Sequence, residues 1–161
     1  MSTPTTFIFG YGATLSAATT SGGTATVINQ LKSISYSADT ADYSDITNLG
    51  SPSAASGGPP VAEFAPSKIT PATATVTGIL APAGDAGQTL IGASFATQTL
   101  LYFTHQLIAV NGETTGAKQT FTAYVSKKPV MDSTIADVVT FNFELKISGV
   151  TVVTPAVTSG S

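Results

Sequence analysis

The sequence contains no cysteine and no arginine, and only 9% of its 161 residues are charged. Without cysteine there is no disulfide framework, no thiolate nucleophile and no structural zinc site of the usual kind. Without arginine, the chain lacks the usual bidentate ligand for phosphate and guanine. Nine acidic residues against six lysines give a net charge of −3. This balance argues against a protein that binds nucleic acid tightly, but not against a protein along whose surface DNA moves without being bound.

Charge is scarce compared with the roughly 25% of charged residues in an ordinary soluble domain. Charges keep monomers apart, and the cores of protein interfaces are depleted in them. The low charge therefore indicates that neighbouring subunits cover much of the surface. Composition alone leaves one alternative open, a threonine-rich sandwich that stays monomeric.

Residues that carry catalysis or bind metals are also few. His105 is the only histidine, and we expect it to be a hydrogen-bonded core or interface residue. Asp39, Asp42 and Asp45 are spaced by three and lack the pattern of an EF-hand calcium loop. The sequence has no P-loop, nucleophile elbow or dinucleotide fingerprint. We therefore predict no enzymatic activity, no cofactor and no metal site.

Long apolar runs are missing too. No stretch approaches the roughly 20 apolar residues that a membrane helix needs. Residues 1–6 show no basic region followed by an apolar run, so no signal peptide is visible. We expect a protein that is made and used in the cytosol and does not contact a membrane.

What the chain does have is 27 threonines and 17 serines beside 42% apolar residues. Threonine favours strands because its branched Cβ suits a pleated surface. The length allows one domain with a buried core. We predict a mainly β fold, a sandwich or barrel with one short flanking α-helix. We place it in a single domain over residues 1–154, followed by a flexible C-terminal tail, residues 155–161.

Alternation of apolar and polar residues marks the strands. Residues 137–148 are the clearest, with one face made of Val139, Phe141, Phe143, Leu145 and Ile147. We expect Gly149 to end this strand and residues 129–136 to form a loop. Residues 98–110 are apolar on both faces and are expected to be covered on both sides. The other predicted strands are residues 7–12, 27–36, 42–49 as a partner of 27–36, 72–80, 119–126 and 150–153.

One helix is predicted, beginning after Asp85 as its N-cap and ending near Ser94. Ala86, Leu90 and Ala93 fall on one side at helical spacing and define its expected packing face. Two glycines within it limit the helix to two or three turns.

Four segments resemble the tail tube, or major tail, proteins of long-tailed bacteriophages, and they occur in the order found in that family. Residues 120–126 (TFTAYVS) and 137–149 (DVVTFNFELKISG) resemble the last long strands of these proteins. Residues 42–52 (DYSDITNLGSP) resemble the segment before the family's long loop. Residues 84–90 (GDAGQTL) resemble the start of its short helix.

This resemblance implies a tail-tube-like β-sandwich or barrel that forms homohexameric rings. The rings would stack into a self-assembling conduit for genome delivery in the virion tail. The implied partners are other copies of the chain, tape-measure and tail-tip or terminator proteins, and DNA that passes through without specific binding. Two alternatives stay open. One is the tube subunit of a bacterial contractile injection or secretion system, and the other is an Ig-like binding or adhesion module.

Residues 50–60 form a long loop by composition, and a loop of this length is usually functional or flexible. We expect it to be mobile in the free subunit and ordered by a neighbouring ring. The candidate inter-ring residues are Gly50, Ser51, Pro52, Ser56, Gly57, Gly58, Pro59 and Pro60.

The wall of a DNA conduit must avoid strong contacts between phosphates and cations. We therefore expect serine, threonine, asparagine and acidic side chains on the inner wall. One candidate lumen face is the polar side of the last long strand, with Thr140, Asn142, Glu144 and Lys146. The other is the threonine face at Thr73 to Thr77. The sequence does not choose between them, because strand order cannot be read from it.

Overall fold

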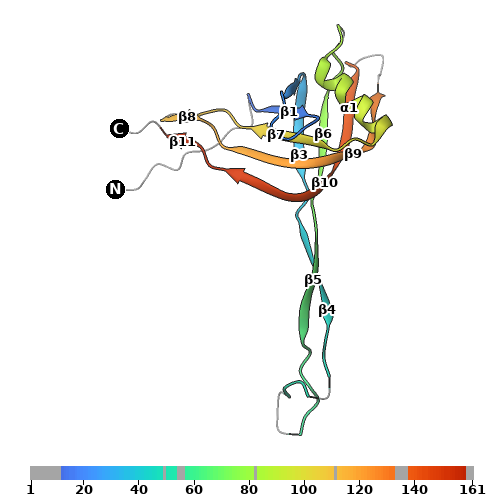
Figure 1. Ribbon diagram of the computed structural model, residues 1–161, viewed down its shortest axis with the longest axis vertical. Helices are drawn as coiled ribbons and strands as arrows, with labels where there is room; N and C mark the ends of the chain where they lie inside the picture. Colours follow the sequence, from blue (N-terminus) through green and yellow to red (C-terminus); the bar gives the residue numbers. More distant parts are fainter. Residues whose placement is uncertain are drawn as a thin grey trace.

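The computed structural model describes residues 12–48, 50–53, 57–81, 83–110, 112–132 and 138–158, with backbone only at 130–132. Within these ranges the chain forms eleven strands and one helix, which confirms a mainly β fold (Figure 1). The strands are β1 (Thr14–Ala18), β2 (Thr26–Ile28), β3 (Leu31–Tyr36), β4 (Thr40–Asp45), β5 (Phe64–Thr70), β6 (Thr73–Ile79), β7 (Leu101–Gln106), β8 (Glu113–Thr115), β9 (Lys118–Asp132), β10 (Thr140–Thr154) and β11 (Val157–Thr158). The helix is α1 (Ala86–Thr97).

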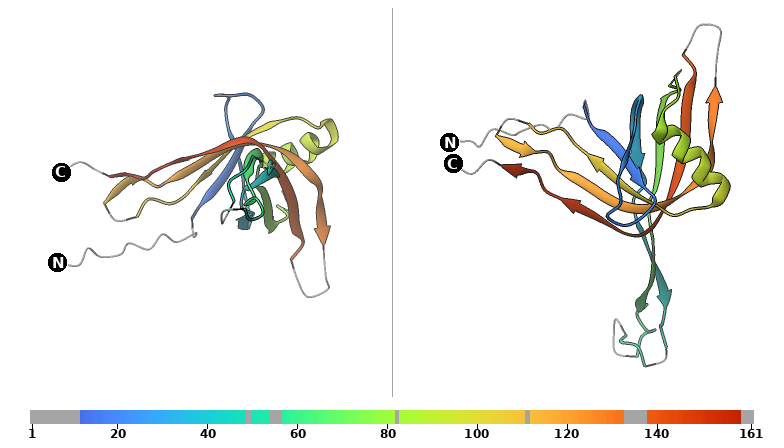
Figure 2. Two further views of the ribbon diagram at one scale, coloured as in Figure 1. Left: turned by 90° about the horizontal axis from the view of Figure 1, so that it is seen from below. Right: turned by 45° about the horizontal axis from the view of Figure 1, so that its top comes forward.

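Seven strands form one antiparallel sheet in the order β2-β1-β7-β9-β10-β6-β3. Strands β2 and β3 follow each other in sequence, yet they lie at opposite edges of this sheet. Only Asn29 and Gln30 separate them, and Gln30 has a φ of 62°. Such a short connection forces the two edges together, so the sheet curls into an open barrel (Figure 2).

The inside of the curl is the hydrophobic core. Strand β10 confirms the predicted alternation for Phe141, Phe143, Leu145 and Ile147, which are all buried. Val139 precedes the strand and is half-buried. The core side of β9 adds Phe121, Ala123 and Val125. The rings of Phe103 and Phe121 stack with their centroids 5.4 Å apart, which joins β7 to β9 in the centre of the core.

Helix α1 begins as predicted, with the Asp85 side chain accepting a hydrogen bond from Gln88 N at 2.8 Å. It runs to Thr97, one turn further than expected, and ends where Gln98 adopts a left-handed conformation. The predicted packing face was only partly right. Leu90 packs against the core, but Ala86 and Ala93 are exposed, and the fully buried residues are Gly87, Gln88, Ile91 and Ser94.

The physical reason is that α1 packs partly against backbone. A Cβ on Gly87 would lie 2.4 Å from Val27 O, so only glycine permits this approach. The Gln88 side chain donates to Ile79 O at 2.9 Å and to Asn29 O at 3.2 Å, and it accepts from Ala81 N at 3.2 Å. Gln88 therefore ties the β2–β3 connection to the end of β6 and helps to hold the barrel closed.

Four predictions about strand bounds and pairing need correction. Residues 27–36 are two strands, and 42–49 do not pair with them, since β3 pairs with β6 and β4 pairs with β5. Residues 129–132 continue β9 instead of forming a loop. Strand β10 does not end at Gly149. It passes through this glycine, with a φ of 85°, and its register with β9 shifts between Ser148 and Val152.

Other predicted elements fall partly outside the described residues. Residues 7–11 of the first expected strand, residues 133–136 of the expected loop and residue 137 of the strand expected at 137–148 lie there. In the expected C-terminal tail, Val157–Thr158 form β11, which pairs with β8. Among the described residues, no helix is long and apolar enough to cross a membrane.

Candidate assembly surfaces

Strands β4 and β5 form a two-stranded hairpin that projects far from the barrel (Figure 1). We call this hairpin, residues 38–71, the arm. Because residues directly opposite each other share a face of the ladder, the register separates its two sides. One face pairs Ala41 with Ile69, Tyr43 with Pro66 and Asp45 with Phe64. The other face pairs Thr40 with Thr70, Asp42 with Lys68 and Ser44 with Ala65.

The first of these faces is mostly apolar and open to solvent, and Asp45 is the charged residue at its tip end. Tyr43 is 63% exposed, Phe64 is 61% exposed and Ile69 is 70% exposed. The opposite face is polar, and Lys68 there lies 3.7 Å from Asp42. An isolated two-stranded hairpin is marginally stable in water. An arm with one bare apolar face is therefore suited to being covered by another molecule.

The tip of the arm is organised by its own polar groups. Thr47 N donates to Asp45 Oδ1 at 2.9 Å, and hydrogen bonds from Thr47 hold the pKa of Asp45 below its usual range. Gly50 N donates to Asn48 Oδ1 at 2.8 Å. Hydrogen bonds from backbone N–H groups to side chains thus replace the hydrogen bonds between the two strands at the point where the strands separate.

The residues predicted to form an inter-ring loop lie at this tip. Ser51 is buried, and its hydroxyl donates to the Glu63 carboxylate. Val61 N donates to Pro52 O at 2.6 Å, and Ser53 bridges to Pro60. Gly57, Gly58 and Pro59 complete the described part of the loop, while Ser56 lies outside the described residues. The loop therefore stands at the far end of a long hairpin.

The two candidate lumen faces turn out to be one surface. Strands β6 and β10 are neighbours, and Thr77 lies opposite Asn142, Thr75 opposite Glu144 and Thr73 opposite Lys146. All six residues lie on the side of the sheet away from the core. Strand β3 extends this side with two serines, since Ser33 pairs with Thr77 and Ser35 with Thr75. We call this surface, on β3, β6 and β10, the polar face.

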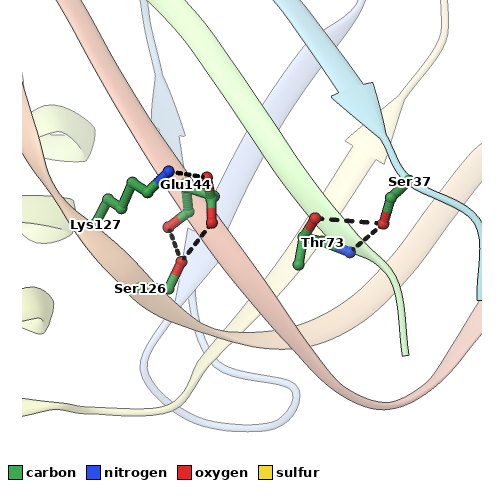
Figure 3. Close-up of polar contacts among 5 residues, drawn as sticks. All are labelled: Ser37, Thr73, Ser126, Lys127 and Glu144. Atoms are coloured by element: carbon green, nitrogen blue, oxygen red, sulfur yellow. Dashed lines mark hydrogen bonds and ion pairs between the residues drawn. The ribbon is translucent and has the colours of Figure 1, made fainter. Parts of the chain in front are cut away.

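Charge on the polar face is partly neutralised locally (Figure 3). Lys127 Nζ lies 2.7 Å from Glu144 Oε2, and Ser126 Oγ donates to the main-chain oxygen of Glu144 at 3.1 Å. The hydrogen bond from Lys127 holds the pKa of Glu144 below its usual range. Ser37 Oγ and Thr73 Oγ1 are 3.3 Å apart at the edge of the same face. Hydroxyl groups, one compensated carboxylate and the exposed Lys146 thus make up most of this part of the sheet.

His105 is a packing residue, as expected. Its Nδ1 is 3.0 Å from the Tyr36 hydroxyl, and the two rings stack at 5.9 Å. Burial lowers the pKa of His105 and raises that of Tyr36. Among the described residues, no group of three or more His, Cys, Asp or Glu side chains is arranged to hold a metal ion.

Two apolar surfaces were missed by sequence reasoning. The first is a cavity of about 410 Å³ lined by Gln30, Ile79, Leu80, Val138 and Val139. We call it the end pocket, because it lies where β6 ends and β3 and β10 begin. The second is the wing, formed by β8, β11 and the end of β10 beyond Gly149, where Val150 is 84% exposed. The run VTVV at residues 150–153 was the available signal, since a strand with so little polar alternation needs cover on both sides.

No protein-family model and no curated protein matches the sequence. Solved structures do. The chain is similar to the SPP1 tail tube, with 13% identity, a TM-score of 0.64, and coverage of 93% of this chain and 80% of that one. It is also similar to the tail of an empty gene transfer agent particle, solved with C6 symmetry (15% identity, TM-score 0.58, coverage 88% and 94%). A third similarity is to the six-fold symmetrised baseplate of the anti-feeding prophage (11% identity, TM-score 0.64, coverage 96% and 98%). The chain therefore has the fold found in these tail and baseplate proteins.

Proposed function

We propose that the protein is the structural subunit of a bacteriophage tail tube, in which hexameric rings stack into a conduit for genome delivery. The observation that carries this proposal is the similarity to the SPP1 tail tube over 93% of the chain. The C6 symmetry of the gene transfer agent tail supports rings of six. A structural role in the virion, without enzymatic activity, follows from this assignment.

The arm is the element that joins one ring to the next in this proposal. Its apolar face is exposed in the single subunit, and its tip carries Gly50, Ser51, Pro52 and the neighbouring loop residues. Removing residues 50–60 is expected to leave the barrel folded, because the described core residues all lie outside the arm. The same deletion is expected to block tube growth.

The polar face is the proposed wall of the lumen. It combines Thr140, Asn142, Glu144 and Lys146 with the threonines of β6. Hydroxyl groups offer no fixed charge to DNA, and Lys127 and Glu144 neutralise each other. Lys146 is exposed on this face and has no ion pair among the described residues, so it adds one unpaired cation per subunit. The remaining hydroxyl and amide groups suit passage without specific binding. Tape-measure and tail-tip or terminator proteins are the further partners we propose.

A second candidate function is the tube of a bacterial contractile injection or secretion system. The similarity to the anti-feeding prophage baseplate favours it, at a TM-score of 0.64. The two functions differ in what surrounds the tube. Purification of the native particle would distinguish them, since a contracting sheath without a DNA-filled capsid belongs to an injection system.

The direct test is electron microscopy of the purified protein over a range of concentrations. Hollow tubes built from six-fold rings are the expected result. A protein that stays monomeric at high concentration would overturn the proposal and favour an Ig-like binding module.

A further inference from the structure

The arm carries the entire net charge of the protein. It contains Asp39, Asp42, Asp45 and Glu63 but only one lysine, Lys68, which gives a charge of −3. The rest of the sequence has five lysines and five acidic residues, and it is therefore neutral. An arm approaching a second arm meets like charge, whereas an arm approaching a barrel does not.

This distribution restricts what can cover the apolar face of the arm. The arm's own barrel leaves Tyr43, Phe64 and Ile69 more than half exposed. Pairing of two arms would bring two sets of carboxylates together. The barrel of another copy is thus the favoured occupant.

The barrel offers an apolar surface in the matching position. The arm leaves the sheet after Tyr36 at the end of β3 and returns before Thr73 at the start of β6. The end pocket lies at the other ends of these same strands, beside Gln30 and Ile79. Each copy therefore has a projecting apolar hairpin at one end and an apolar cavity at the opposite end.

We propose that the apolar face of the arm covers the end pocket of a second copy, with Phe64 directed at Val138 and Leu80. This inference rests on the proposed function and names the surface that receives the arm. The contact is heterologous, since the arm of one copy meets the pocket of the next, and a heterologous contact that does not close generates an open filament.

The dimensions agree with this contact. Phe64 lies at the tip end of the arm, opposite Asp45. The six residues of β4 span about 20 Å at roughly 3.4 Å per residue, and this length separates Phe64 from its own barrel. Val138 is itself exposed, so it is open to a Phe64 that arrives from a second copy.

The test is cysteine cross-linking, which is unambiguous because the chain has no cysteine of its own. The double variant Phe64→Cys with Val138→Cys is oxidised under assembly conditions and examined on a denaturing gel. A head-to-tail contact gives a ladder of covalent oligomers. Each single variant gives at most a dimer, because it has only one thiol.

Two control pairs make the result specific. Ser44→Cys with Val138→Cys moves the arm thiol to the polar face, and it is expected to give less than one-tenth of the ladder. Phe64→Cys with Val150→Cys tests the wing as the receiving surface. A ladder from the wing pair alone would overturn the inference, as would tubes that form without a ladder from the Val138 pair. Failure of every variant and of the unmodified chain to form tubes would instead remove the proposed function and the inference with it.

Discussion

Replacing Phe64 with serine should weaken tube assembly without unfolding the subunit. Phe64 is 61% exposed in the single chain, so roughly 90–150 Å² of its side chain is accessible to solvent and can be buried in a contact. At about 25 cal/mol per Å², covering this area contributes on the order of 2–4 kcal/mol per subunit. Since about 1.4 kcal/mol corresponds to a factor of ten, the critical concentration for tube growth should rise on the order of 40- to 500-fold.

The assay is sedimentation of tubes from a dilution series, with electron micrographs of the pellet. Thermal unfolding of the dilute subunit serves as the stability control, and the midpoint should barely move, since an exposed side chain contributes little to the fold. Thr70→Ser on the polar face lowers strand propensity in the same hairpin but removes little apolar area, so it should assemble normally. An unchanged critical concentration for Phe64→Ser would refute the role of this face. Equal losses in both variants would point to hairpin formation instead of docking.

Three further predictions follow from the barrel. Gln88→Leu removes three hydrogen bonds between α1 and the main chain, and we expect it to lower the free energy of unfolding by about 2–4 kcal/mol, measured by urea denaturation. Glu144→Gln leaves Lys127 without its carboxylate partner, so tubes of this variant should bind DNA in a salt-dependent way that the unmodified tubes do not, by electrophoretic mobility shift. In the folded chain, burial lowers the pKa of His105 below its ordinary value of 6.5. The contribution of neutral His105 to the free energy of unfolding is therefore complete above pH 6.5 and is lost as the pH falls through the folded pKa. His105→Gln should flatten the dependence of the unfolding midpoint on pH just below 6.5, and an unchanged slope would contradict this assignment.

The strands of the C-terminal third were predictable because one of their faces is buried. In β10 every second residue from Phe141 to Ile147 enters the core, so hydrophobicity alone fixes the period. The end of this strand was not predictable in the same way. Gly149 usually marks a break, but here it supplies the positive φ at an irregularity, after which pairing with β9 resumes.

The pairing of the arm and the full packing face of the helix could not be predicted from apolar spacing, because neither depends only on apolar side chains entering the core of the chain. Alternation reports contact with a core, and the arm has no core to contact within its own chain. The expected partner of β4 was therefore wrong, although the loop at its tip was correctly located. In α1 part of the packed surface is built from Gly87 and Gln88, which fit against backbone. Apolar spacing therefore identified Leu90 correctly but not the rest of this surface.

The polar face shows what pairing register adds to composition. Two separate polar strand faces were each a candidate for the lumen, and nothing in the sequence related them. The register of β6 with β10 places Thr73, Thr75 and Thr77 directly beside Lys146, Glu144 and Asn142. The two candidates are therefore not alternatives, because any partner or cavity that meets one of them meets the other. The net charge of −3 lies on the arm and not on this surface, which separates the acidic, apolar element proposed to bind the next copy from the hydroxyl-rich surface proposed to let DNA pass.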